Sequence, residues 1–466
     1  CEDLAKWKEL SDDIWIWNYN TNFANYDLPF PSLRSIEANV KYFLNNNVHG
    51  LFMQANGNGM SGELSDLRNY VLSHTIWNPQ EGGWARVEEF CRLHYGASAG
   101  PILDYLNYLH DTADAKGVHP ECFPTALESG LDQDLALKAM AWFKEAMEIA
   151  PDDVTRLRVE KASLCAYKAL LATSGSTRYD GGKCYLDIPE EHATLIDDYI
   201  ALARKHGLTR TRETVLAETF FEEIKGMSAG FPAVQIENDV WRITVLPEEN
   251  GKLTEMVHKP TGRDVVYPRG RMFNRHRSFE EWGVLGFEPS ELLKFTATMD
   301  GDDVILTGKL DDRFTLVRRI GFDALDPNRV LFSSRLTHHG AEETSYQVWI
   351  HPEYDADSIV DDDEVLTAYI DDQGWKKVND DFEIDRGPNA GLLRTARGNQ
   401  FAFYNHAAKF GIVQIYDHGV MERTNLFWHP SRSQVNLELY TQVKALKTGE
   451  SLDYGYAVAY LEKAPE

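Results

Sequence analysis

The chain has 466 residues, a length typical of two to four domains, and 43% of them are hydrophobic and 26% charged. This composition is close to the average of soluble globular proteins and excludes a disordered or fibrous chain. Asp and Glu total 73 against 47 Lys and Arg, which gives a net charge of −26. So acidic a surface repels phosphate backbones and anionic lipid, and we expect no nucleic-acid partner.

The sequence contains no run of about 20 apolar residues, so we expect no membrane-spanning segment. Five cysteines without CxxC spacing argue against a zinc ribbon or a dense disulfide framework, although one bridge stays open. Aromatic residues make up 12% of the chain, with 11 Trp and 21 Tyr. This content fits surfaces that stack on sugar rings, and it also fits large interfaces between domains.

The first part of the chain alternates strand and helix patterns. Apolar runs rich in β-branched and aromatic residues predict strands at 12–19 and 48–54. Helical spacing of apolar residues predicts helices at 32–47, where Ser32 is the candidate N-cap, and at 63–74. Strand, loop and helix in repeated order form the unit of a parallel sheet or a (β/α) barrel, but two such units cannot close a barrel.

The middle of the chain is mostly helical in pattern. Apolar residues recur on one helix face at 131–150 and 154–171, and further helices are expected at 189–206 and 210–225. Such a bundle normally packs against another domain.

From about residue 227 the apolar period changes to two. Strand candidates such as 241–246, 346–350, 435–439 and 454–460 follow one another at short intervals, with turn residues between them. This pattern predicts a large antiparallel sandwich.

Several motifs near the start of the chain resemble one family. They are the aromatic and Asn-rich segment 14–31, the strand 48–54, the Trp77-Asn78-Pro79 segment and the segment 90–97. Together they resemble the domain-of-unknown-function family 4838 over roughly residues 1–110. Its members look like secreted bacterial proteins distantly similar to the α-glucuronidases of glycoside hydrolase family 67. The resemblance therefore implies a secreted, periplasmic or cell-surface bacterial location.

The family resemblance also implies a domain order. In that family a (β/α)8 barrel is followed by a helical region and can be followed by a sandwich, so residues 1–82 would be the last βα units of a barrel. The chain then looks like a C-terminal fragment, and the acid and base carboxylates of the glucuronidases would lie largely before Cys1. As an alternative, Cys1 is the lipidated first residue of a mature lipoprotein.

A second resemblance concerns the C-terminal half. The segments 236–247, 251–263 and 448–461 resemble the opening and the last strand of a galactose-mutarotase-like supersandwich. The expected fold class is thus multidomain α/β plus all-β. It comprises the C-terminal part of a (β/α)8 barrel at 1–82, an α-helical domain at 83–226 and a mutarotase-like β-sandwich at 227–466.

Candidate sugar-binding residues follow the two predicted strands of the first part. Glycoside hydrolysis needs two carboxyl groups on either side of the scissile bond, and in a barrel they lie at the carboxyl ends of strands. The residues found there are mostly neutral hydrogen-bonding and aromatic side chains. We assign Trp17, Tyr19, Asn22, Gln54 and Asn56 to substrate binding, with loop packing and turn formation as the alternative roles.

Three further residues carry candidate acid–base chemistry. Glu63 is the candidate catalytic residue, and its alternative role is that of a first-turn acid stabilised by the helix dipole. In the sandwich, His351 and Glu438 invite comparison with the His acid and Glu base of a mutarotase, although a second matching His is missing. Structural roles are expected for His338, His339 and His276, because these histidines lack metal-ligand spacing.

Metal binding has little support in the sequence. Asp355, Asp357 and the acidic run 361–364 resemble a calcium loop by charge alone, because the Gly and the terminal Glu of an EF-hand are missing. This pattern is typical of a solvated loop, so no cofactor is expected and calcium is the one that stays open. Motifs typical of nucleotide binding, metalloproteases and serine hydrolases do not occur.

The sequence therefore predicts a carbohydrate-active protein with an oligosaccharide or polysaccharide as its partner. The expected activity is that of a glycoside hydrolase, glucuronidase-like or hexosaminidase-like, to which this chain supplies part of the substrate pocket. One alternative is a non-catalytic carbohydrate-binding or scaffold module. The other is a sugar epimerase or polysaccharide lyase. The sugar, the linkage and the oligomeric state stay open.

Overall fold

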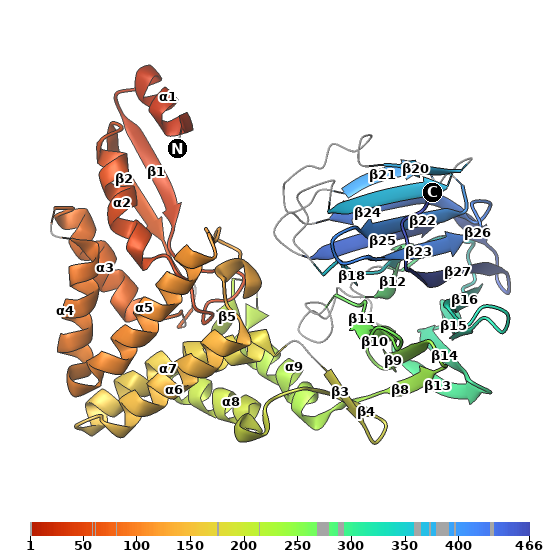
Figure 1. Ribbon diagram of the computed structural model, residues 1–466, viewed down its shortest axis with the longest axis horizontal. Helices are drawn as coiled ribbons and strands as arrows, with labels where there is room; N and C mark the ends of the chain where they lie inside the picture. The colour runs from red at the N-terminus through yellow and green to blue at the C-terminus, as the bar shows by residue number, and fades with distance from the viewer. Residues whose placement is uncertain are drawn as a thin grey trace. The chain divides into compact units, whose positions relative to one another are not determined.

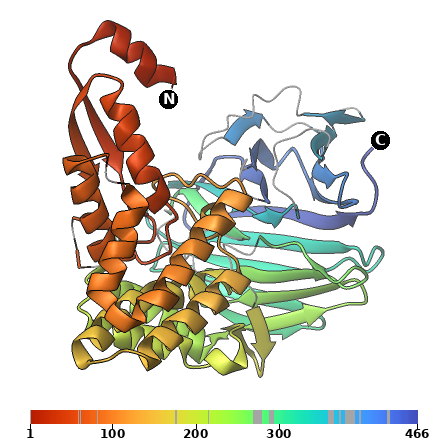
Figure 2. The same ribbon diagram turned by 60° about the vertical axis from the view of Figure 1, so that its left-hand side comes forward.

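The computed structural model describes residues 2–57, 59–60, 62–80, 82–174, 177–213, 215–267, 279–287, 293–357, 365–371, 374–378, 391–395, 398–428 and 433–466. The chain forms two compact units (Figures 1 and 2). The first comprises Cys1–Ser174 and Ile188–Gly226, and the second comprises Gly175–Asp187 and Met227–Glu466.

A small parallel sheet opens the first unit. Strands β1 (Ile14–Tyr19) and β2 (Val48–Gln54) pair in parallel, and helix α2 (Leu33–Leu44) connects them. Helix α2 packs on β2, which makes this segment the predicted strand–helix–strand unit. Two paired strands do not make a barrel, so the barrel stays a prediction.

Five further helices of the first unit share one hydrophobic core with this segment. They are α3 (Ser65–Trp77), α4 (Gly83–Tyr95), α5 (Ala99–Ala115), α6 (Gln133–Glu148) and α7 (Asp153–Thr173). Helices α1 (Glu2–Leu10) and α8 (Leu195–Lys205) also belong to this unit. The core runs from Leu28 to Ala166 in sequence and includes Leu67, Leu106 and Phe143. Residues 1–82, predicted as the end of a barrel, and residues 83–226, predicted as a separate helical domain, therefore both contribute side chains to one core.

One helix prediction was wrong at its start. Residues Arg210–Arg212 (β5) and Val215–Leu216 (β6) form a short hairpin, and helix α9 (Ala217–Ala229) begins only at Ala217. The segment is rich in threonine and ends in valine, and β-branched side chains disfavour the helix. The carbonyl oxygen of Thr211 instead accepts a hydrogen bond from the backbone N–H of Tyr26.

A second hairpin interrupts the helical region and belongs to the second unit. Strands β3 (Thr177–Asp180) and β4 (Lys183–Leu186) are joined at Gly181 and Gly182, whose φ angles are 56° and 78°. Positive φ at both turn residues is typical of the tight hairpin turn that glycine permits. Strand β4 also pairs with β7 (Phe231–Pro232), which ties the hairpin to the sandwich.

The second unit consists mainly of three antiparallel sheets. One orders its described strands as β13 (Phe295–Asp300), β14 (Asp303–Leu310), β15 (Phe314–Phe322), β16 (Arg329–His338), β27 (Ser451–Leu461), β23 (Phe410–Tyr416), β22 (Gln400–Asn405), β19 (Leu366–Asp371) and β20 (Trp375–Lys377). Another orders them as β12 (Glu280–Leu285), β17 (Thr344–His351), β25 (Gln434–Thr441), β24 (Met421–Trp428) and β21 (Gly391–Thr395), with β18 (Tyr354–Asp355) on β25 and β26 (Lys444–Leu446) on β17. A smaller sheet contains β11 (Arg263–Asp264), β10 (Lys252–His258), β9 (Trp241–Leu246) and β8 (Val234–Glu237).

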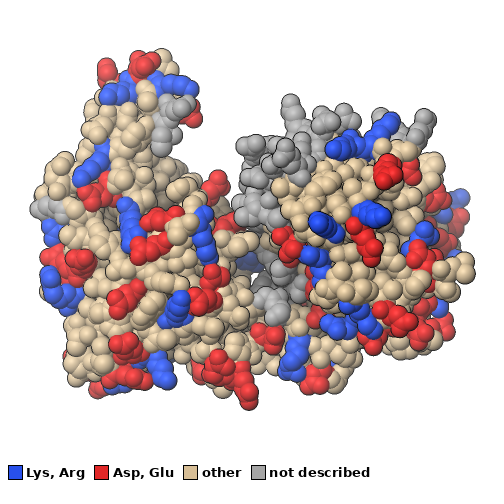
Figure 3. Space-filling view, in the orientation of Figure 1, with Lys and Arg blue, Asp and Glu red and all other residues tan. Residues whose placement is uncertain are grey.

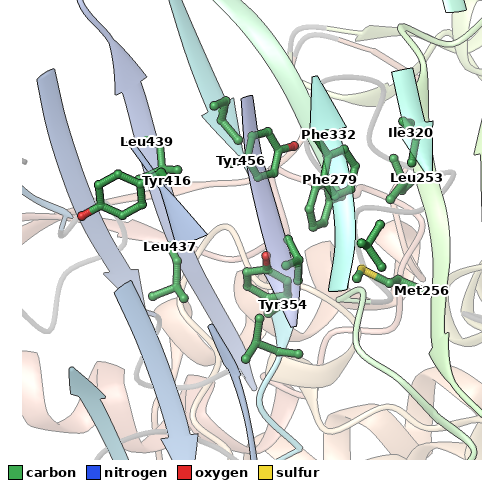
Figure 4. Close-up of a cluster of buried hydrophobic side chains, with 14 of the residues drawn as sticks. Leu253, Met256, Phe279, Ile320, Phe332, Tyr354, Tyr416, Leu437, Leu439 and Tyr456 are labelled. Atoms are coloured by element: carbon green, nitrogen blue, oxygen red, sulfur yellow. The ribbon is translucent and has the colours of Figure 1, made fainter. Parts of the chain in front are cut away.

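Side chains from these three sheets meet in one core, part of which is shown in Figure 4. Met256 comes from β10, Phe332 from β16 and Leu437 from β25, and all three are buried. The predicted large antiparallel sandwich is present, and the period-two pattern was its signal in the sequence.

The described cysteines Cys91, Cys122, Cys165 and Cys184 are thiols, with no disulfide among them. Burial raises the pKa of Cys91 to about 12, which makes this thiol unreactive at neutral pH. No helix in the described part of the chain combines the length and the apolar character that a membrane crossing requires. On the face shown in Figure 3, acidic and basic side chains are interspersed.

Candidate functional site

Strands β17 and β25 carry a polar face opposite the sandwich core. On β17, Val348 and Ile350 point into the core, so their neighbours Trp349 and His351 lie on the other face of the sheet. On β25 the same alternation places Leu437 and Leu439 in the core and leaves Asn436, Glu438 and Tyr440 on the other face. The predicted candidates His351 and Glu438 therefore share one face of neighbouring strands.

The structure brings His351 and Glu438 into contact. Nε2 of His351 lies 3.4 Å from Oε1 of Glu438, and the residues are only 5% and 3% exposed. Nδ2 of Asn436 donates to the same carboxylate oxygen at 3.2 Å and lies 3.3 Å from Nε2 of His351. An imidazole and a carboxylate that are neighbours can act as general acid and general base on the same bound molecule.

The second oxygen of Glu438 is held from two other positions. Oε2 accepts hydrogen bonds from the indole N–H of Trp349 at 3.0 Å and from Nδ2 of Asn425 on β24 at 2.6 Å. A buried carboxylate needs such donors, because water no longer solvates it. The carboxylate is thus fixed in one orientation beside His351.

Aromatic rings surround this pair. The Trp282 ring stacks on the His351 ring at 4.9 Å and an interplanar angle of 4°, and the Trp349 ring meets it edge-on at 4.6 Å. The Tyr440 ring stacks on Trp349 at 5.6 Å. Burial and the neighbouring Glu438 carboxylate raise the pKa of Tyr440. Stacked aromatic rings and fixed polar groups therefore adjoin one another on this face of the sheet.

A buried ion pair supports the aromatic wall. The indole N–H of Trp282 donates to Oε2 of Glu280 at 2.5 Å. Oε1 of Glu280 lies 3.1 Å from Nζ of Lys252, and both side chains are buried. Glu280 therefore fixes the ring that stacks on His351, and Lys252 balances its charge.

Sequence reasoning found His351 and Glu438 but missed the residues that surround them. Trp282, Trp349, Asn425 and Asn436 lie on strands whose alternate positions are core residues. A polar or aromatic residue at every second position of a buried strand was the available signal. Register decides which of them meet: Trp349 pairs with Trp282 and Asn425 with Glu438.

The first unit holds the sugar-binding residues predicted near β1 and β2. The indole N–H of Trp17 donates to Oε1 of Gln54 at 2.6 Å, and the Trp17 and Tyr19 rings lie 6.4 Å apart. Trp17 is 63% and Tyr19 is 45% exposed, so both present their rings to solvent. These three side chains therefore form one exposed aromatic surface, which Phe52 extends at 5.0 Å from Trp17.

The other predicted residues of the first unit make contacts of their own. Asn22 is buried, donates to the carbonyl oxygen of Pro124 and accepts from the backbone N–H of Ala24, so it holds its own loop. Asn56 lines a cavity of about 240 Å³, and so does Glu63.

Glu63 is buried in an ion pair with Arg68. Arg68 also donates to the backbone oxygen of Phe30 and, at 2.8 Å, to Oγ of Ser32. Burial raises the pKa of Glu63, and the charge of Arg68 and the hydroxyl of Tyr105 work against this rise. The partner of Glu63 is thus a side chain rather than the dipole of helix α3.

Ser32 precedes helix α2, as expected of an N-cap, but its side chain makes no capping hydrogen bond. Two of the remaining predicted histidines are held by neighbours within the sandwich. Nδ1 of His338 lies 2.8 Å from the hydroxyl of Tyr346, and Nε2 of His339 lies 2.8 Å from Oγ1 of Thr315.

The acidic run 361–364 and His276 lie outside the described residues. Asp357 forms an ion pair with Arg263 at 2.7 Å. Across the part of the chain that the structure describes, no group of three or more His, Cys, Asp or Glu side chains is arranged to hold a metal ion.

Residues 1–108 match the family DUF4838, a domain of unknown function. The family resemblance predicted for this part of the chain is thereby confirmed. None of the curated proteins matches the chain in sequence.

Several solved structures similar to this chain are mutarotase-like proteins, the second class that the sequence resembles. A putative aldose 1-epimerase from Escherichia coli is 9% identical, with 49% of this chain and 98% of that chain covered and a TM-score of 0.39. A galactose mutarotase-like protein from Lactobacillus casei is 10% identical, with 49% and 99% covered and a TM-score of 0.39. A galactose mutarotase related enzyme from Lactobacillus acidophilus is 12% identical, with 50% and 99% covered and a TM-score of 0.38.

Proposed function

We propose that this chain is a carbohydrate-active protein whose sandwich binds a reducing sugar and interconverts its anomers. The observation that carries the proposal is the contact between His351 and Glu438 on a polar sheet face with Trp282 and Trp349 around it. The hydroxyl and ring oxygens of an anomeric centre are bonded to the same carbon. A base and an acid that serve these two oxygens must therefore be neighbours themselves, as these two residues are.

The proposed reaction is a ring opening followed by closure. The Glu438 carboxylate takes the proton of the anomeric hydroxyl while the His351 imidazolium gives its proton to the ring oxygen. The bond between the anomeric carbon and the ring oxygen breaks, and an open-chain aldehyde forms. Rotation about the adjacent carbon–carbon bond and reversal of both proton transfers close the ring as the other anomer.

Asn425, Asn436 and Trp349 would keep the Glu438 carboxylate oriented throughout this cycle, because they donate to it without exchanging a proton. The stacked Trp282 ring would restrict the imidazole to one plane. Acid–base catalysis requires the Glu438 carboxylate and the His351 imidazole to be held in place, because a small displacement of either group takes it out of hydrogen-bonding reach of the substrate oxygens.

Anomer exchange measured by nuclear magnetic resonance tests the proposal. We expect the full chain to accelerate exchange of at least one aldose, and Glu438→Gln and His351→Asn each to lower the catalysed rate by about 100-fold or more. Glu343→Gln and His418→Asn change exposed residues of the same types and serve as matched controls. A panel of neutral and acidic aldoses without any acceleration would reject the proposal.

Glycoside hydrolysis, the activity that the family resemblance predicts, is the second candidate function. It is favoured by the surface of Trp17, Tyr19 and Gln54 on two parallel strands, where Tyr19 and Gln54 are the last residues of β1 and β2. If the protein cleaves an aryl glycoside or a uronic-acid oligosaccharide, we expect Gln54→Ala and Tyr19→Phe to weaken cleavage. Trp7→Ala alters a similarly exposed tryptophan and is the control. Cleavage that survives both changes would remove these residues from the substrate pocket.

A further inference from the structure

Asn436 contacts both members of the proposed acid–base pair. Its Nδ2 atom lies 3.2 Å from Oε1 of Glu438 and 3.3 Å from Nε2 of His351, and the two latter atoms are 3.4 Å apart. Asn436 is only 2% exposed, so its side chain is enclosed by protein groups. Of the three atoms, the carboxylate oxygen only accepts and the amide nitrogen only donates, whereas Nε2 of the imidazole can do either.

The orientation of the Asn436 amide follows from its neighbours. Its Oδ1 atom accepts a hydrogen bond from Nε2 of Gln434 at 3.2 Å. The reversed amide would bring Oδ1 within 3.2 Å of the Glu438 carboxylate oxygen, and two acceptors without a proton between them repel each other. The Nδ2 atom of Asn436 therefore faces His351 and Glu438.

The proposed reaction requires His351 in both protonation states. The ring gives a proton to the sugar oxygen during ring opening and takes it back during closure. While Nε2 carries the proton, Oε1 of Glu438 is the acceptor beside it, and after the transfer Nδ2 of Asn436 is the donor beside it. Without that donor the bare nitrogen would be a buried acceptor without a partner, which is unfavourable.

We infer that Asn436 is a positioning residue for the acid of this reaction. It donates to Nε2 of His351 once this nitrogen has lost its proton, and it thereby holds the neutral ring in the tautomer that keeps its proton on Nδ1. Nε2 is then the atom that exchanges the proton with the sugar. The inference rests on the proposed anomer exchange and goes beyond it, because orientation of the Glu438 carboxylate does not require a donor to His351.

The charged groups around His351 act in the opposite direction to Asn436. Glu438 lies at 3.4 Å, Glu280 is the register partner of His351 on β12, and the buried Glu353 follows two positions along the chain. Carboxylates favour the protonated ring, although Lys252 balances the charge of Glu280. A donor to Nε2 favours the neutral ring. Without the Asn436 amide, the carboxylates should therefore keep His351 protonated up to a higher pH.

Nuclear magnetic resonance of the full chain with isotope-labelled histidine tests the inference without substrate. Ring nitrogens with and without a proton differ widely in chemical shift, and the His351 signals are those that His351→Asn removes. We expect neutral His351 to carry its proton on Nδ1 and to have a bare Nε2. Asn436→Leu has nearly the same size and no polar group, so the proton of the neutral ring should move to Nε2 and face Glu438. The pH at which half of the rings are protonated should rise by about one unit.

Asn425→Leu is the matched control, because Asn425 donates to Oε2 of the same carboxylate and the donor beside His351 stays in place. This variant should keep the proton of neutral His351 on Nδ1. Asn436→Asp keeps the shape of the side chain and replaces the donor by a carboxylate. It should raise the pH of half-protonation further than Asn436→Leu does, and it provides the result if the leucine variant does not fold.

Anomer exchange provides the second measurement. In Asn436→Leu we expect kcat to fall about 10-fold, because the ring that has given up its proton loses its partner. KM should stay within about two-fold of its original value, since Asn436 contacts His351 and Glu438 rather than the sugar.

The inference is overturned if neutral His351 of the unaltered chain carries its proton on Nε2. It is also overturned if Asn436→Leu and Asn436→Asp fold and leave both the tautomer and the pH of half-protonation unchanged. A chain that exchanges anomers but gives either result retains the proposed function and loses the role of Asn436. A chain that accelerates exchange of no aldose loses the proposed function, and the role of Asn436 in it, whatever the resonance data show.

Discussion

Single buried polar residues are held in both units by several partners at once. Glu438 accepts hydrogen bonds at both of its carboxylate oxygens. Arg68 pairs with Glu63 and also donates to the backbone oxygen of Phe30 and to Oγ of Ser32. Removing one partner of such a group costs more than the bond itself, because the other partner stays buried without water. The residues that carry the candidate chemistry are therefore also residues that the fold depends on.

The protonation of His110 should make the free energy of unfolding depend on pH. Its Nε2 accepts the backbone N–H of Leu33 at 3.1 Å, so the proton lies on Nδ1, which donates to the carbonyl oxygen of Leu106 at 2.8 Å. Burial lowers the pKa of His110 from 6.5 to about 4. Between these values the unfolded chain binds the proton and the folded chain does not, so stability falls as the pH drops through this range.

We expect the free energy of unfolding of the first unit to lose up to about 3 kcal/mol between pH 6.5 and pH 4 from this residue alone. The difference between the unaltered chain and His110→Gln, followed by denaturant unfolding at several pH values, isolates the contribution. His418→Gln removes an exposed histidine and should leave the pH dependence unchanged. Equal slopes for His110→Gln and the unaltered chain would contradict the prediction.

At the scale of elements, alternation and register together decide which side chains meet. Side chains of strand β25 alternate between the core and the polar face. Its pairing with β24 then places Asn425 beside Glu438, and its pairing with β17 places Tyr440 beside Trp349. A register shift by one residue would exchange the two faces. The candidate site is therefore a property of three paired strands rather than of any one of them.

Helix capping gives a prediction at the same scale. The side chain of Asp132 accepts a hydrogen bond from the backbone N–H of Leu135 at 2.8 Å and so caps helix α6. Asp132→Ala should destabilise the first unit by about 1 kcal/mol in denaturant unfolding. Asp132→Asn keeps an equally good cap and should cost clearly less. Equal losses for the two variants would assign the effect to the ion pair with Lys116 instead.

The whole molecule is divided differently from the order of its sequence. The hairpin of β3 and β4 lies between two helices of the first unit along the chain, yet it belongs to the sandwich unit. Oγ1 of Thr177 donates to Oε1 of the buried Glu255 at 3.3 Å, and Cys184 is buried against Thr254. The chain thus passes into the second unit, returns to the first, and enters the second again.

Replacing residues 177–187 by a Gly/Ser linker tests this division. We expect the thermal transition of the sandwich unit to fall, because Glu255 loses a partner and the edge of β7 loses its neighbour. The transition of the helical unit should stay near its original temperature. Calorimetry of the full chain resolves the two transitions, and a change confined to the helical unit would contradict the assignment.

The sequence determined the type and position of most elements. Period-two apolar patterns located strands such as β9 and β25, and helical spacing located α6 and α7 within a few residues. These patterns are local, because each element must turn its own apolar side chains toward a core. The sequence also singled out His351 and Glu438 as candidate acid and base. The helix predicted at 210–225 was wrong for its first residues, because the threonines of this segment favour extended backbone over a helix.

Only the tertiary structure decided which of these residues meet. His351 and Glu438 are 87 positions apart in the chain but in contact across paired strands, and Trp282 reaches them from a third strand. The cavity of the first unit likewise joins Asp27 and Glu63 to Ala162 of a distant helix. These contacts between residues distant in sequence depend on strand register and on how the helices and strands pack. Local periodicity fixes the face on which a side chain lies and carries no information about its partner across the sheet.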